Sequence, residues 1–154
     1  MQFSAVLFDK HNTLWLGTVK EGLYSYNTEK EYFVRHDTLS GYLKSNFVTS
    51  LTLDKKGAIL AGTWGGGLSV VADNQATILT EDKGLGENKI RCAMVDDEGN
   101  IWAGTNQNGL SCYRGDRFEV FFKSRGGPNT QVGAVFGDSK GRMWFGANNH
   151  IMLI

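Results

Sequence analysis

Asp-Asp-Glu-Gly-Asn-Ile-Trp-Ala-Gly-Thr, at residues 96–105, occurs in related form four times along this chain of 154 residues. The other copies read Asp-Lys-His-Asn-Thr-Leu-Trp-Leu-Gly-Thr at 9–18, Asp-Lys-Lys-Gly-Ala-Ile-Leu-Ala-Gly-Thr at 54–63 and Asp-Ser-Lys-Gly-Arg-Met-Trp-Phe-Gly-Ala at 138–147. They start at residues 9, 54, 96 and 138, so successive copies are 45, 42 and 42 residues apart. A near-constant period of this length is typical of proteins built from repeated supersecondary units.

Each copy lies among short segments that we interpret as β-strands. The leading Asp begins a turn, and its carboxylate accepts backbone N–H groups; glycine follows three residues later in three of the copies, as in a type I turn. Because the Asp recurs in every copy, we interpret it as a turn residue and not as a catalytic acid. The expected first strands are 5–8, 50–53, 92–95 and 134–136, the second are 14–17, 59–62, 101–104 and 143–146, the third open at Leu23, Leu68 and Leu110, and the fourth cover 31–35, 75–79 and 117–122.

The first strands are apolar on both faces, which indicates burial on both sides. Four short antiparallel strands in about 40 residues match one blade of a β-propeller. No segment has helical periodicity, which argues against alternating strands and helices. We therefore predict an all-β fold, a β-propeller fragment of about three and a half four-stranded antiparallel blades. Its repeats are placed at about 4–46, 47–88, 89–130 and 131–154, with the chain ending where the third strand of the last blade is due.

Composition argues against several other classes of protein. Sixteen Lys and Arg balance 16 Asp and Glu, so the chain lacks the basic stripe that nucleic acid or an anionic membrane attracts. The two cysteines, Cys92 and Cys112, have neither the density of a disulfide scaffold nor the spacing of a zinc site, and the expected second strand separates them. The three histidines also lack ligand spacing. No metal, cofactor, disulfide, signal peptide or membrane span is expected.

The repeat resembles the two-component regulator propeller repeat. The resemblance rests on the order Asn-x-Val/Ile, Asp-x-x-Gly, Leu-Trp-x-Gly-Thr and Gly-Gly-Leu; it is best at 48–68 and 90–110 and extends over nearly the whole chain. Two positions depart from the pattern. Leu60 replaces the repeat tryptophan, and Thr130 stands where the pattern has asparagine.

This resemblance implies the periplasmic sensor region of a membrane-anchored hybrid two-component histidine kinase, a receptor class associated with carbohydrate sensing. The implied function of the segment is ligand sensing without catalysis of its own, the kinase belonging to the larger parent protein. Two alternatives on the same fold stay open, a lyase-type propeller enzyme and a protein-interaction scaffold, because fold alone does not choose between them.

The expected partners follow from the same interpretation. They are an oligosaccharide or another small ligand, and the remaining blades of the parent receptor. An incomplete ring leaves open blade edges, so we also expect self-association, with two copies approximating one ring.

Ligand contacts are expected on loops at one end of the blades, because loops vary without disturbing the core. These loops join second to third strands at 18–21, 63–66, 105–108 and 147–150, and successive blades at 37–46, 81–88 and 123–130. Trp64, the tryptophan outside the repeat column, either stacks on a sugar ring or packs against the neighbouring blade.

Polar residues near the same loops complete the candidate site. Arg91 enters an otherwise apolar inner strand, where it either holds a carboxylate or sulfate of a ligand or pairs with an acid of another blade. Loop amides either bind hydroxyl groups or shape turns, and His150 is either a lyase-type acid–base residue or a turn histidine. The candidate ligand-binding residues are Trp64, Arg91, Asn106, Gln107, Asn148, Asn149 and His150, with Asn108 in the same loop as Asn106.

Overall fold

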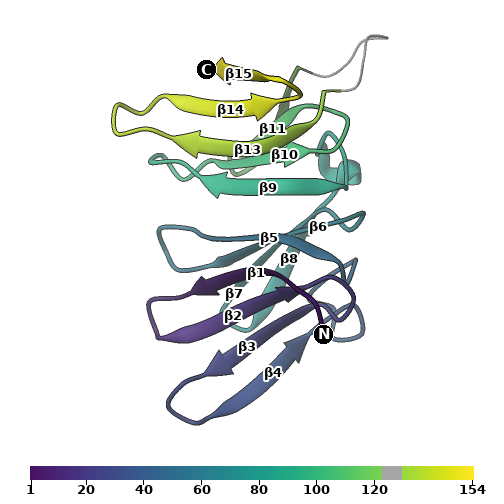
Figure 1. Ribbon diagram of the computed structural model, residues 1–154, viewed down its shortest axis with the longest axis vertical. Helices are drawn as coiled ribbons and strands as arrows, with labels where there is room; N and C mark the ends of the chain where they lie inside the picture. The colour runs from purple at the N-terminus through teal and green to yellow at the C-terminus, as the bar shows by residue number, and fades with distance from the viewer. Residues whose placement is uncertain (123–129) are drawn as a thin grey trace.

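The computed structural model describes residues 1–122 and 130–154, which form fifteen β-strands and one short 3-10 helix. The strands make four antiparallel sheets stacked along the chain, each built from strands that follow one another in sequence (Figure 1). We call these sheets blades 1 to 4. The predicted all-β propeller fold is confirmed. The predicted loop at 123–130 lies, apart from Thr130, outside the described residues.

The elements have the following bounds. Blade 1 contains β1 (Phe3–Phe8), β2 (Thr13–Thr18), β3 (Leu23–Asn27) and β4 (Tyr32–His36). Blade 2 contains β5 (Val48–Leu53), β6 (Ile59–Thr63), β7 (Leu68–Ala72) and β8 (Gln75–Leu79), followed by the 3-10 helix η1 (Glu81–Lys83). Blade 3 contains β9 (Ile90–Val95), β10 (Ile101–Thr105), β11 (Leu110–Tyr113) and β12 (Phe118–Phe121), and blade 4 contains β13 (Val132–Gly137), β14 (Met143–Ala147) and β15 (His150–Leu153).

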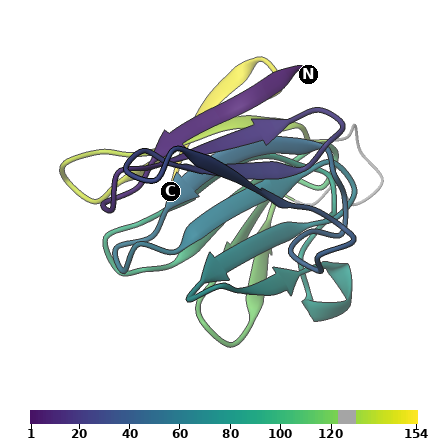
Figure 2. The same ribbon diagram turned by 90° about the horizontal axis from the view of Figure 1, so that it is seen from below.

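The first strand of each blade faces the interior of the stack. β1, β5, β9 and β13 pack against one another in that order, and Figure 2 shows from below that successive sheets are rotated relative to one another. This arrangement covers β5 and β9 on both sides, which explains why they are apolar on both faces, whereas β1 and β13 are each covered on one side.

Blade 4 contains more strand than the sequence predicts. β15 pairs with β14 along its length, so the prediction that the chain ends where the third strand begins is wrong. The reason is a shorter connection. Asn148, with φ of 50°, turns the chain, and Gly146 pairs with Ile151, whereas the equivalent glycine of the other blades pairs with a leucine six residues on.

The repeated Asp clamps the turn between the first and second strands. In blade 3, one carboxylate oxygen of Asp96 accepts the backbone N–H groups of Glu98 and Asn100 at 3.0 and 2.8 Å, and the other accepts the indole N–H of Trp102 at 2.8 Å. Blades 1 and 4 repeat this set of bonds from Asp9 and Asp138. One side chain therefore orders the turn and orients the tryptophan that packs on the next blade.

The clamp of blade 2 differs because its indole is missing. Asp54 accepts the backbone N–H groups of Lys56 and Ala58 at 2.8 and 2.7 Å, as in the other blades, but Leu60 occupies the tryptophan position. The chain thus holds one natural variant of the clamp in which only the turn bonds remain.

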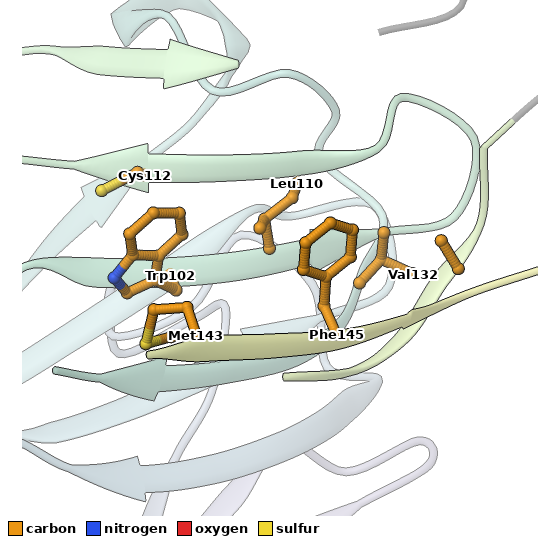
Figure 3. Packing of buried hydrophobic residues seen from close by; sticks show 7 residues of the cluster. Trp102, Leu110, Cys112, Val132, Met143 and Phe145 are labelled. Atoms are coloured by element: carbon orange, nitrogen blue, oxygen red, sulfur yellow. The ribbon is translucent and has the colours of Figure 1, made fainter. Parts of the chain in front are cut away.

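Neighbouring blades bury an apolar layer between them. Between blades 3 and 4, Trp102 is 3% exposed and Phe145 is 1% exposed, and side chains from both blades interlock (Figure 3). Cys112 belongs to this layer; β10 separates it from Cys92, and both are free thiols. Burial raises the pKa of each thiol to about 11, so both are protonated at neutral pH.

The glycine near the end of the second strand lets the next blade approach the backbone closely. A Cβ added to Gly104 would lie 2.5 Å from Cys92 Sγ and 2.8 Å from the Val132 carbonyl oxygen, and Gly17 and Gly62 are approached as closely by β5 and β9. A Cβ added to Gly146 would meet nothing within 4 Å. The glycine is therefore required where another blade follows.

The outer faces of blades 1 and 4 are apolar and exposed in the described structure. Ile151 takes the position that holds a fully buried leucine in blades 1 to 3, yet it is 80% exposed. Phe3 takes the position that holds a fully buried valine or isoleucine in blades 2 to 4, yet it is 56% exposed. We call these surfaces the two end faces.

Replacing Asp96 with Ala tests the clamp. The change leaves two backbone N–H groups, the Asn100 side-chain amide and the Trp102 indole without their acceptor, and we expect a loss of about 2–3 kcal/mol in the free energy of unfolding, measured by urea denaturation. Asp54→Ala is the matched control, because it removes the turn bonds alone; we expect about 1 kcal/mol. Equal losses would show that the indole bond adds nothing.

The effect of Asp96 also depends on pH. Burial raises its pKa, but the bonds from Trp102, Asn100 and the backbone outweigh burial and hold the pKa below its ordinary value. The stabilisation is therefore present above the unfolded-state pKa of about 4 and is lost as pH falls through the lower folded-state value.

Replacing Gly104 with Ala tests the close approach between blades. The added methyl group collides with the backbone of β13, and we expect a loss of about 1–3 kcal/mol in the free energy of unfolding from overpacking. Gly146→Ala places the same group at the same repeat position in open space. Thermal or urea unfolding of this variant at low protein concentration should match the wild type, and a comparable loss in both variants would contradict the explanation.

Candidate functional site

The loops between second and third strands meet the connections between blades at one end of the stack, which we call the loop face. A recurrent backbone bond joins them: Trp64 N–H donates to the Phe47 carbonyl at 2.8 Å, and Asn106 N–H donates to the Lys89 carbonyl at 3.0 Å. The same bond recurs in blades 1 and 4, from Val19 to Gln2 and from Asn148 to Gln131. Two columns of side chains, one on each partner of this bond, therefore come together on the loop face.

A second recurrent bond explains the asparagine of the repeat and its replacement. Gly67 N–H donates to the Asn88 carbonyl at 2.9 Å, and Gly109 N–H donates to the Thr130 carbonyl at the same distance. Because the backbone makes this contact, it is retained at Thr130. The Asn88 side chain holds its own loop instead, accepting the Glu81 N–H at 3.0 Å.

Arg91 breaks a pattern of bonds between inner strands. It lies at the β-bulge that opens each inner strand, where Ser4 donates its hydroxyl to the Val48 carbonyl at 2.6 Å and Thr49 donates to the Ile90 carbonyl at 2.8 Å. Arginine has no hydroxyl group for this bond. A cation therefore occupies a position that is a small hydroxyl residue in the two preceding blades.

The guanidinium of Arg91 turns towards the loop of its own blade. Arg91 Nη1 donates to Asn106 Oδ1 at 3.0 Å, and Gln131 Nε2 donates to the same oxygen at 3.2 Å. Within the described residues, Arg91 has no acidic partner. Of the two predicted roles for Arg91, pairing with an acid of another blade is therefore not what the described structure contains.

Trp64 lies half-buried between two neighbours on the loop face. Its ring is 6.1 Å from the Phe47 ring, between centroids, and the Lys89 ammonium lies 5.8 Å from its centroid. Lys89 belongs to the connection that enters blade 3, so the predicted packing against a neighbouring blade is present. At this place the loop face therefore presents an indole ring with a cation beside it.

The remaining candidate residues shape the loops. Gln107 has an exposed side chain, and its backbone N–H donates to Glu87 Oε2 at 2.6 Å. Asn148 makes the tight turn before β15, where its Oδ1 accepts the Gln131 N–H at 3.1 Å. Asn149 is exposed beside it.

Asn108 and His150 are the last two residues considered for the site. Asn108 donates its side-chain amide to the Gly86 carbonyl at 2.8 Å. His150 was expected in a loop but is the first residue of β15, because the loop before it is shorter than in the other blades.

The sequence interpretation missed three residues of this face, namely Phe47, Lys89 and Gln131. Each directly precedes an inner strand, and each accepts the recurrent backbone bond from the facing loop. Aligning the residue before each inner strand would have found them as a column. The site that the structure assembles is therefore Trp64 and Lys89 beside Arg91, Asn106 and Gln131.

Comparison with known proteins agrees with this architecture. Residues 84–107 and 126–149 match the family model described as two component regulator propeller. These two segments, about a third of the chain, match the two component regulator propeller repeat. A search of curated proteins finds no match.

Solved structures of similar fold extend the comparison to nearly the whole chain. The chain is similar to the extracellular domain of BT3049, described as a hybrid two component system of B. thetaiotaomicron, with a TM-score of 0.82 and 24% identity over 98% of this chain and 21% of that chain. It is also similar to the extracellular domain of BT4673 from the same organism, with a TM-score of 0.77 and 22% identity over 99% of this chain and 22% of that chain.

A third similar structure is an enzyme. Virginiamycin B lyase from Staphylococcus aureus, in its inactive H270A form with quinupristin, has a TM-score of 0.74 and 12% identity over 99% of this chain and 55% of that chain. At these identities the similarities show the fold alone. The chain spans about a fifth of the length of the two extracellular domains. No helix within the described residues is long and apolar enough to cross a membrane.

Proposed function

We propose that the chain is part of the extracytoplasmic sensor of a two-component receptor and binds a small acidic oligosaccharide on the loop face. The observation that carries the proposal is Arg91, a cation without an acidic partner in the described structure, placed at a position that is Ser or Thr in blades 1 and 2. A structural role would be met by serine or threonine, as it is there. The regulator propeller repeats and the likeness to sensor domains support the receptor class.

The side chains around Arg91 define the class of ligand. A guanidinium holds a carboxylate or sulfate through two parallel hydrogen bonds. The Trp64 ring offers a flat apolar surface for the C–H groups of a sugar, and Lys89 adds a second positive charge beside it. An indole with two cations fits an acidic sugar better than a neutral one.

The placement of acid–base groups favours binding over lyase chemistry. General acid–base catalysis requires groups that converge on one bond of a substrate. His150 begins β15 in blade 4, whereas Glu21 belongs to blade 1 and accepts a hydrogen bond from Tyr24 Oη at 3.1 Å. In this proposal, catalysis and membrane anchoring belong to other parts of the receptor.

We expect isothermal titration calorimetry to detect binding of uronic-acid oligosaccharides and weaker binding of neutral oligosaccharides of equal length. Arg91→Met should weaken binding of the acidic sugar about tenfold or more, through loss of charge-assisted bonds, and should reduce the preference for acidic sugars. Trp64→Ala should weaken binding of both sugars. Arg117→Met, an exposed arginine at the opposite end of blade 3, is the matched control. Equal affinity of wild type and both loop-face variants would refute the site.

The end faces suggest how the segment assembles. In blades 1 to 3, one face carries the residue at the repeat-tryptophan position, namely Trp15, Leu60 or Trp102. That face always packs on the opposite face of the next blade. The end face of blade 4 is of the first kind, with Phe136 67% exposed, and that of blade 1 is of the second kind, with Phe3 and Val6 56% and 65% exposed. We propose that these two faces pair head to tail, between two copies when the segment is alone and with further blades in the full receptor.

Sedimentation velocity tests this pairing. The wild-type segment should associate as its concentration rises, and Gly146→Ala or Ile151→Lys should shift it to the monomer, because each change obstructs the end face of blade 4 without touching a described neighbour. Leu39→Lys is the control, since Leu39 is 94% exposed and lies on neither end face. A wild-type segment that stays monomeric at all concentrations would rule the pairing out.

A further inference from the structure

Asn106 holds the Arg91 guanidinium without neutralising it. Arg91 Nη1 donates to Asn106 Oδ1 at 3.0 Å, and both residues are half-buried on the loop face. Elsewhere in the described chain, Arg35, Arg114 and Arg142 each have a carboxylate oxygen nearby, at 3.1, 3.7 and 2.6 Å. A carboxylate is the usual partner of a guanidinium, because it supplies both hydrogen-bond acceptors and the opposite charge. At Arg91 the partner supplies the acceptor alone.

The Asn106 amide is fixed by two blades. Its backbone N–H donates to the Lys89 carbonyl at 3.0 Å, which ties it to the connection that enters blade 3. Gln131, which directly precedes β13 of blade 4, donates its Nε2 to the same Asn106 Oδ1 at 3.2 Å. The backbone N–H and carbonyl of Gln131 are held in turn by Asn148, at 3.1 and 2.9 Å. The acceptor that meets Arg91 is therefore anchored in blade 3 and steadied from blade 4.

The two donors also determine which way the amide faces. Arg91 and Gln131 donate to the same atom of Asn106, so that atom is the amide oxygen, since the nitrogen would bring donors together. The amide nitrogen makes no hydrogen bond within the described residues. Arg91 also keeps most of its five N–H groups, because one bond to Asn106 uses one of them. The groups that these two side chains leave unoccupied are therefore all donors.

Donors beside a positive charge select a ligand group that only accepts. A carboxylate or sulfate offers several acceptor oxygens and a negative charge, whereas a neutral hydroxyl group brings a proton of its own and no charge. Because Arg91 and Asn106 are half-buried, solvent screens the guanidinium charge less than at a fully exposed position. An acidic side chain at position 106 would also hold the guanidinium, but it would cancel that charge.

We propose that Asn106 sets the specificity of the loop-face site for an acidic ligand group. It is a positioning residue: its oxygen fixes the guanidinium of Arg91, and its lack of charge leaves the guanidinium available to an anion. This inference rests on the proposed function, because it concerns the same site. It adds that one neutral amide decides between an acidic and a neutral sugar.

Calorimetry of Asn106→Asp tests the proposal. The new carboxylate still accepts from Arg91 and Gln131, so the loop should keep its structure while the charge of Arg91 is cancelled. We expect uronic-acid oligosaccharides to bind about tenfold or more weakly, and neutral oligosaccharides of equal length to bind with unchanged affinity. Asn46→Asp is the matched control, because Asn46 Oδ1 also accepts a backbone N–H, from Thr38 at 3.0 Å, in the connection between blades 1 and 2. This control should bind both sugars as the wild type does.

Asn106→Ala separates charge from position. It removes the acceptor and adds no charge, so it should weaken binding of the acidic sugar less than Asn106→Asp does and should keep the preference for that sugar. Equal losses in the two variants, or a preference for acidic sugars that survives Asn106→Asp, would contradict the role of the neutral amide. A parallel loss of both sugars in Asn106→Asp would assign the residue to folding of the loop and would also refute the proposal.

A second measurement needs no sugar. In Asn106→Asp, the charge of Arg91 should lower the pKa of the introduced carboxyl group. The double variant Arg91→Met, Asn106→Asp lacks that charge, so the acid dissociation constant of the same group should fall about tenfold or more. NMR titration of the carboxyl carbon measures both values. Equal values would overturn the inference whatever the sugars do. Different values in a chain whose wild type binds no acidic sugar would place the failure with the proposed function and not with the placement of Arg91 by Asn106.

Discussion

The close approach of one blade to the glycine of the blade before it is the constraint on which the stack depends. β5, β9 and β13 each press against the second-strand glycine of the preceding blade, at distances that exclude even a methyl group. That approach lets the large side chains of neighbouring blades interlock and bury fully, as Trp102 and Phe145 do. A propeller of this kind is therefore a series of similar interfaces, each needing the same small residue at the same place.

The aspartate clamp makes those interfaces reproducible. By accepting two turn amides and one indole N–H, Asp96 connects the geometry of a turn to the orientation of a core tryptophan. Blade 2 shows how far this can vary, since Leu60 gives up the indole bond and still packs fully buried against blade 3. The repeat therefore keeps the backbone geometry of the turn in every blade and tolerates changes in the side chains that meet between blades.

That tolerance allows the side chains that could contact a ligand to differ from blade to blade. At the loop face, the backbone bonds recur in every blade while the side chains on them change to Trp64, Lys89 and Asn106. Between blades 1 and 2, smaller residues open a hollow and a Ser25–His36 pair replaces two apolar side chains. At the loop face the proposed binding rests on the departure from the repeat and not on the repeat itself, because a scaffold bond that recurs in every blade carries no information about a ligand.

The sequence by itself determined the fold, the number of blades and the role of each motif residue, because the period, the turn signals and the buried strands are local and repeat four times. It also singled out Arg91 and Trp64 as candidate residues. Only the tertiary structure decided that Arg91 turns to Asn106, that Lys89 lies beside Trp64, and that a hollow forms between blades 1 and 2. Those facts depend on which side chains of neighbouring blades face each other, and residues some 40 positions apart reveal this only once the register between the blades is known.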